Sequence, residues 1–199
     1  MKAKGSGNPD NPKFQPAYNK SALIQVRNSD KYCMFYALEL ARKFHDQKEI
    51  ERFKKDEPIP MQRKELIGKD AFRNFRSDGS AQNANIRRLI KEIGILPDRP
   101  SYGVEEAARM QEYYDRKYPD TYRIVIMDNN PVAKPIWKAP FRNYRYQVAI
   151  FHDGNHYHAL KSVASYFFGP GVKYCIGKYK INEQLKYICE FRLRKALCS

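Results

Sequence analysis

Two kinds of hydrophobic pattern are separated along this chain, and that separation most constrains its fold. Before Pro119, apolar residues recur at helical spacing. After Pro119, the apolar segments are short and rich in β-branched and aromatic residues. Helices followed by strands are typical of an α+β domain, in which helices pack on one sheet. We therefore predict N-terminal helices followed by an antiparallel sheet.

The helical pattern occurs in three segments, which are residues 32–44, 81–94 and 103–114. In the first, the apolar stripe predicts that Glu39, Arg42 and Lys43 lie on the opposite, polar side. Gly94 is suited to a helix C-cap. Residues 48–69 are charged and contain two prolines, so we predict a linker with helical patches there.

The predicted strands are residues 122–127, 144–151 and 156–163, with an extended lead-in at 21–27 and a further antiparallel partner at 165–168. The tripeptide Asp153-Gly154-Asn155 predicts a tight turn between the second and third of these strands.

The ends of the chain differ from its middle. Residues 1–20 are rich in Gly, Pro, Asn and Lys, which predicts a disordered basic tail. We expect the folded domain to span residues 21–168, and residues 169–199 to form a basic tail that contains cysteines. The net charge of +15 divides into +4 for residues 1–27, +5 for 28–160 and +6 for 161–199. Basic ends of this kind favour contact with nucleic acid or with an acidic partner.

Composition also bears on the class of protein. The mean hydropathy is −0.76, and no stretch of about 18 apolar residues exists, so we expect no membrane partner. Residues 1–20 lack the apolar core of a secretory signal, and four widely spaced cysteines do not resemble a disulfide framework. We therefore expect an intracellular protein, either cytoplasmic or nuclear.

Cys33 is the first candidate for chemistry because it falls in the first turn of a predicted helix. A helix N-terminus stabilises a thiolate, and the free N–H groups of the first turn, in the region of Asp30 to Cys33, can bind an oxyanion. The alternative is that Cys33 is a small buried apolar residue, which is the usual state of a free cysteine.

His156 is the candidate general base because a strand edge can hold an imidazole rigidly against a nucleophile. His152 and His158 are rivals, and a surface histidine at a hairpin is the simpler alternative. A triad also needs a group that orients the imidazole. Asp153, Asn155 and His158 are the candidates for that role, and the sequence does not choose among them.

Two short motifs resemble those of ovarian-tumour (OTU) type cysteine proteases. The run of residues 30–37, DKYCMFYA, resembles that family's D-G-N-C-L-F-x-A nucleophile motif, and residues 156–160, HYHAL, resemble its histidine motif. The family has Asn or Asp where this chain has His158. The resemblance implies a papain-like fold, Cys33 as nucleophile, His156 as base, and a ubiquitin-like C-terminal tail as substrate.

A broader likeness covers roughly residues 22–190. This region is similar to a cysteine-protease-like region beside family B DNA polymerases of Polinton/Maverick-type mobile elements and related viral genes. That region is usually followed by a zinc finger that begins Y-C-x-x-C. Here Tyr174-Cys175 is present, but Lys178 replaces the second cysteine and only Cys189 and Cys198 follow. Three cysteines without a histidine cannot complete a four-ligand zinc site, so we expect no metal and no cofactor.

Two functions remain open from the sequence. The first is a cysteine-dependent peptidase or isopeptidase, with possible deubiquitinase-like activity on a protein substrate. The second is a catalytically inactive module of a mobile-element replication protein that binds DNA or a partner.

Overall fold

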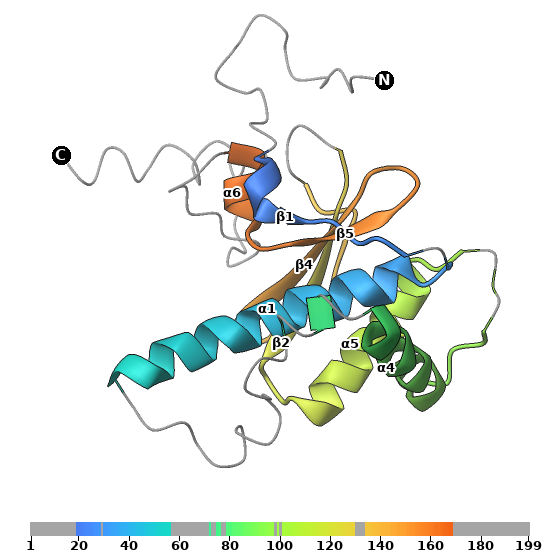
Figure 1. Ribbon diagram of the computed structural model, residues 1–199, viewed down its shortest axis with the longest axis horizontal. Coiled ribbons are helices and arrows are strands. Elements are labelled where there is room, and N and C mark those ends of the chain that lie inside the picture. Colours follow the sequence, from blue (N-terminus) through green and yellow to red (C-terminus); the bar gives the residue numbers. More distant parts are fainter. Residues whose placement is uncertain are drawn as a thin grey trace, which may run out of the picture.

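The computed structural model describes residues 19–28, 30–56, 72, 75–76, 79–97, 99, 101–129 and 134–168. The helices among them are η2 (Lys20–Ala22), α1 (Cys33–Asp56), α4 (Gly79–Glu92), α5 (Val104–Lys117) and α6 (Val163–Phe168). The strands are β1 (Leu23–Ile24), β2 (Tyr122–Met127), β3 (Trp137–Lys138), β4 (Tyr146–His152) and β5 (Tyr157–Leu160). The class is therefore mixed α+β, as predicted (Figure 1).

The five strands form one sheet in the order β1-β5-β4-β2-β3. The prediction of an antiparallel sheet is wrong at its centre, because β2 and β4 pair in parallel, from Tyr122 beside Tyr146 to Met127 beside Phe151. The connection explains this pairing. After β2, the chain returns along the outer edge of β2 as the antiparallel strand β3, and it then enters β4 from the same end as β2.

The sheet separates two apolar clusters. On one face, α1 packs against β5 and β4, and α4 and α5 lie on the same side (Figure 1). On the other face, α6 and η2 cover side chains such as Val125, Phe151 and Leu160. Consecutive strand residues point to opposite faces, so the fully buried β2 supplies both clusters.

Two local predictions are wrong. Residues 165–168 lie in helix α6, because Ser162 Oγ accepts a hydrogen bond from the N–H of Ser165, 3.2 Å away, as an N-cap residue does. The linker predicted with helical patches is helical at its start, because α1 continues to Asp56, two residues before Pro58. Asn19 and Lys20 are ordered, since the N–H of Asn19 donates to Tyr166 O at 2.8 Å.

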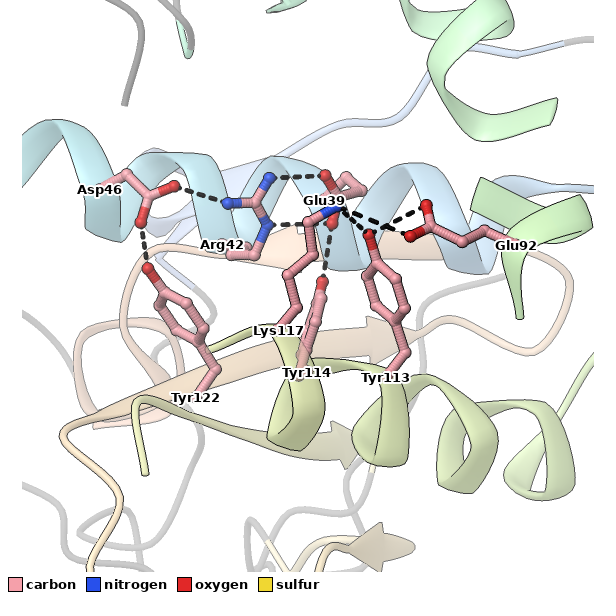
Figure 2. Close-up of polar contacts among 8 residues, drawn as sticks. All are labelled: Glu39, Arg42, Asp46, Glu92, Tyr113, Tyr114, Lys117 and Tyr122. Carbon is pink, nitrogen blue, oxygen red and sulfur yellow. Dashed lines mark hydrogen bonds and ion pairs between the residues drawn. The ribbon is translucent and has the colours of Figure 1, made fainter. Parts of the chain in front are cut away.

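The predicted polar side of α1 is also wrong for Glu39 and Arg42, which are buried, whereas Lys43 is half-buried; Asp46, one turn beyond Arg42, is buried as well. Figure 2 shows the Arg42 guanidinium between the two carboxylates, at 2.8 Å from Glu39 and 2.7 Å from Asp46. Tyrosine hydroxyls from α5 and β2 add further hydrogen bonds: Tyr114 donates to Glu39 Oε1, which also accepts from Arg42, and Tyr122 donates to Asp46 Oδ1, the oxygen that Arg42 does not contact. A charged cluster can be buried when it is paired and hydrogen-bonded in this way.

Candidate active site

The start of α1 is held by the carboxylate of Asp30. Its Oδ1 accepts hydrogen bonds from the Tyr32 N–H at 3.0 Å and from Asn28 Nδ2 at 2.6 Å, and its Oδ2 accepts from the Tyr36 hydroxyl at 3.1 Å. Cys33 follows as the first residue of the helix, as predicted. Because Asp30 occupies the Tyr32 N–H, an oxyanion at this site would have to use the N–H groups of Cys33 and Met34.

The Cys33 thiol is half-buried, and it meets a backbone N–H from a distant part of the chain. Burial raises the pKa of the thiol, and the negative charge of Asp30 raises it further. The N–H groups of Tyr157, Met34 and Cys33 itself act in the opposite direction, with Tyr157 the strongest of the three. Cys33 is therefore a protonated thiol at neutral pH in this structure, and it needs a base before it can attack a carbonyl.

The Tyr157 N–H belongs to the peptide bond that joins His156 to Tyr157, so the fold brings residues 33 and 156 into one neighbourhood. Helix α1 packs on β5 here, and a tight turn fixes the start of β5. In that turn Asp153 Oδ1 accepts from the N–H groups of Asn155 and His156, at 2.9 and 2.8 Å. The turn predicted from Asp153-Gly154-Asn155 is confirmed, with Gly154 at a φ of 106°.

The His156 ring does not have a hydrogen bond to the Cys33 thiol among the described contacts. Its Nε2 atom is buried, and the structure gives it no hydrogen-bond partner. His156 therefore lies near Cys33, but no hydrogen bond between its ring and the thiol is found among the described residues. Catalytic hydrogen bonds are often long or poorly aligned without substrate, so this geometry does not exclude the pairing.

His158 is turned toward other groups. Its Nδ1 accepts from the Val26 N–H at 3.3 Å, so its Nε2 carries the proton and faces Asp153 Oδ2 at 3.4 Å. Burial lowers the pKa of His158 despite the charge of Asp153. The centres of the His156 and His158 rings are 5.2 Å apart. His152, the other rival, has its ring 4.5 Å from that of Tyr157.

No match to this chain is found among protein-family models, curated proteins or solved structures.

Two residues of this site were not predicted to act in it. Tyr157 supplies the N–H at the thiol, and Asn28 donates from its side-chain amide to Asp30. For Tyr157 the sequence signal is that it directly follows His156 in a predicted strand, where a backbone N–H can donate to a neighbouring element. For Asn28 the signal was its separation of two residues from Asp30, the spacing of a local side-chain contact.

The described residues hold no group of three or more His, Cys, Asp or Glu side chains arranged to bind a metal ion. Cys175, Cys189 and Cys198, with Lys178 and Tyr174, lie outside those residues. Within the described part of the chain, every helix is too short or too polar to cross a lipid bilayer.

Proposed function

We propose that this chain is a cysteine-dependent peptidase or isopeptidase in which Cys33 is the nucleophile and His156 the general base. The observation that supports the proposal is the packing of α1 against β5, which places the Cys33 thiol against the core cluster that Tyr157, the residue after His156, also contacts. The two candidates are 123 positions apart in the sequence; Cys33 begins α1, and His156 directly precedes β5. A half-buried thiol with a raised pKa also requires a neighbouring base for its chemistry.

The reaction is acyl transfer. The imidazole of His156 takes the thiol proton, and the sulfur of Cys33 attacks the carbonyl carbon of the substrate. The N–H groups of Cys33 and Met34 stabilise the oxyanion, and the imidazolium gives its proton to the leaving amine as the C–N bond breaks. Water, deprotonated by His156, then attacks the thioester. The C–S bond breaks, the acid product leaves, and the sulfur regains its proton.

The proposed fold type and substrate class are those that the sequence resemblance to OTU-type proteases implies. We infer a papain-like arrangement, in which the nucleophile begins a helix and the base lies on the sheet that the helix packs against. A ubiquitin-like C-terminal tail is the substrate class to test first, because such tails are extended peptides whose last carbonyl is accessible to a thiol.

The test uses the full chain and a ubiquitin probe that carries a C-terminal electrophile. We expect a single adduct by intact mass, which peptide mapping assigns to Cys33. Cys33→Ala should lose the adduct while keeping Cys175, Cys189 and Cys198 as internal controls for non-specific alkylation. His156→Ala should slow adduct formation by roughly 100-fold or more, whereas His152→Ala should not. A folded protein that forms no adduct at Cys33 would contradict the proposal.

A second candidate is the inactive binding module, which is favoured by the missing hydrogen bond between the thiol and His156. It predicts DNA binding that weakens with salt and is unchanged by Cys33→Ala. The informative truncation removes residues 169–199 and keeps α6, since Tyr166 and Phe167 are part of the core. A truncated chain with the same affinity and the same salt dependence would rule out the tail as the binding element.

A further inference from the structure

Two buried side-chain atoms in the described part of the chain have no hydrogen-bond partner, and both belong to the candidate site. They are Asn28 Oδ1 and His156 Nε2. A buried polar atom without a partner costs about 1–3 kcal/mol, so such atoms are rare and concentrate where a function requires them. One of the two is an obligatory acceptor, and the other becomes a donor when it carries a proton.

The amide of Asn28 has a fixed orientation. Its Nδ2 donates to two oxygens of Asp30, the main-chain O at 2.8 Å and Oδ1 at 2.6 Å. Exchanging the two amide atoms would place an acceptor against two acceptors, so the assignment of oxygen and nitrogen is determined by Asp30. The Oδ1 atom consequently faces away from Asp30 and is available to another donor.

The path of the chain leads Asn28 toward His156. Strands β1 and β5 pair in antiparallel register, with Leu23 opposite Leu160 and Ile24 opposite Ala159. Beyond this pairing the Val26 N–H still donates to His158, so the segment continues alongside β5. Continued in the same register, residue 28 comes opposite residue 155, next to His156.

We propose that Asn28 is the positioning residue for His156, with Asn28 Oδ1 accepting a hydrogen bond from the Nε2–H of the imidazole. This inference rests on the proposed function, and it names the third group that the Cys33–His156 pair lacks. The other candidates have contacts of their own or face solvent: His158 faces Val26 and Asp153, Asp153 holds the backbone of the turn, and Asn155 is exposed. The structure has no hydrogen bond between Asn28 Oδ1 and His156 Nε2, and we expect it to form in the free protein in solution.

This bond has a defined chemical consequence. With the proton on Nε2, the neutral ring keeps its lone pair on Nδ1, and Nδ1 is then the atom that takes the proton of the Cys33 thiol. When the ring becomes an imidazolium, the Asn28 oxygen stabilises the charged form without itself accepting a proton. A neutral amide can serve here because its role is to select the tautomer and the ring orientation.

The test reads the tautomer of His156 directly, by long-range proton–nitrogen NMR on the ¹⁵N-labelled full chain above pH 8. In wild type we expect the Nε2–H form to predominate. Asn28→Ala should shift the ring toward a mixture of tautomers, whereas Asn28→Asp should retain the Nε2–H form. Both variants lose the Nδ2 bonds to Asp30, so that loss cannot account for a difference between them, which comes from the charged acceptor that only Asn28→Asp has at this position. Tyr36→Phe, which removes another bond to Asp30 and leaves Asn28 intact, should match wild type.

The inference and the proposed function fail in different ways. A wild-type ring in the Nδ1–H form would overturn the role of Asn28 whether or not the variants fold, and so would an unchanged tautomer in folded Asn28→Ala. With a ubiquitin-derived substrate, Asn28→Ala should reduce kcat by roughly 10- to 100-fold with little change in KM. If the tautomer shifts as expected but wild type has no turnover, the positioning role stands and the hydrolase proposal fails.

Discussion

The sharpest test of this fold is to remove the guanidinium from its buried ion cluster, with Arg42→Met. Only 5% of Arg42 is exposed, and Met fills the space of its aliphatic stem while deleting the guanidinium and its charge. It also removes the contact of the guanidinium with the Tyr118 ring, whose centre is 5.0 Å away. The variant leaves two carboxylates, Glu39 and Asp46, buried without their cation.

The expected loss is large. Removing one partner of a buried ion pair costs about 3–5 kcal/mol, because the remaining charge is left uncompensated. With a urea dependence of about 2 kcal/mol/M, the unfolding midpoint should fall by about 1.5–2.5 M. Arg88→Met is the matched control, since Arg88 is exposed on α4 and its midpoint should stay close to that of wild type.

The loss of stability in Arg42→Met should depend on pH. In wild type the pKa values of the two carboxyls are shifted in opposite directions. Burial alone would raise the pKa of Glu39, but Arg42 holds it below its ordinary value. Glu39 therefore stabilises the fold above its unfolded pKa, and this contribution is lost as the pH falls through the folded value. Burial raises the pKa of Asp46 despite Arg42, so Asp46 opposes folding at neutral pH.

Without Arg42 both carboxyls should have raised pKa values and should take up protons as the pH falls. The difference in unfolding free energy between wild type and Arg42→Met should therefore narrow between pH 7 and pH 5. Urea titrations at both pH values, followed by circular dichroism, measure it. A loss below about 1 kcal/mol at pH 7, or a difference that widens on acidification, would refute the claim that this cluster is held by its central cation.

Two further predictions concern conformation and protonation elsewhere in the fold. Gly94 lies two residues after the end of α4 with a φ of 67°, so Gly94→Ala should cost about 1 kcal/mol by urea unfolding, whereas Gly79→Ala, at the start of the same helix, should be neutral or slightly stabilising. Burial lowers the pKa of His45 to about 4, so its neutral ring stabilises the fold above pH 6.5 and this contribution, up to about 3 kcal/mol, is lost as the pH falls to 4. The free energy of unfolding of His45→Gln should lack this pH-dependent contribution. If its pH dependence matched that of wild type, the low pKa of His45 would be contradicted.

The local elements of this fold could be predicted from the sequence where periodicity and end signals agree. Strand β2 has the predicted bounds, and α4 and α5 are within three residues of theirs. The parallel pairing of β2 and β4 could not be predicted, because pairing is set by the path of the connection and not by the residues within a strand. The α6 segment was ambiguous for a different reason, since aromatic residues in a short run suit a strand or a helix, and only the Ser162 cap distinguishes the two.

The buried charges of α1 show what periodicity misses. Glu39 and Arg42 lie off the apolar stripe, so the pattern assigns them to solvent, yet they are buried together with Asp46. What buries them is a set of tyrosines from α5 and β2, far along the chain, whose hydroxyls complete their hydrogen bonds. In the same way, Cys33 was predicted from its own segment, but the Tyr157 N–H and the Asn28 amide act through contacts that a linear pattern does not contain.

The ion cluster around Arg42 and the candidate site at Cys33 both involve helix α1, but they have different roles. Cys33 and Asp46 are 13 residues apart, which in an α-helix is about 20 Å. The ion cluster joins the middle of α1 to α5 and β2, whereas the start of the helix, with Asp30 and Asn28, meets β5. A change at Arg42 therefore acts on the folded fraction of the whole domain, and a change at Asn28 acts on one imidazole. Activity lost in an Arg42 variant should return on stabilising the fold, whereas activity lost in Asn28→Ala should not.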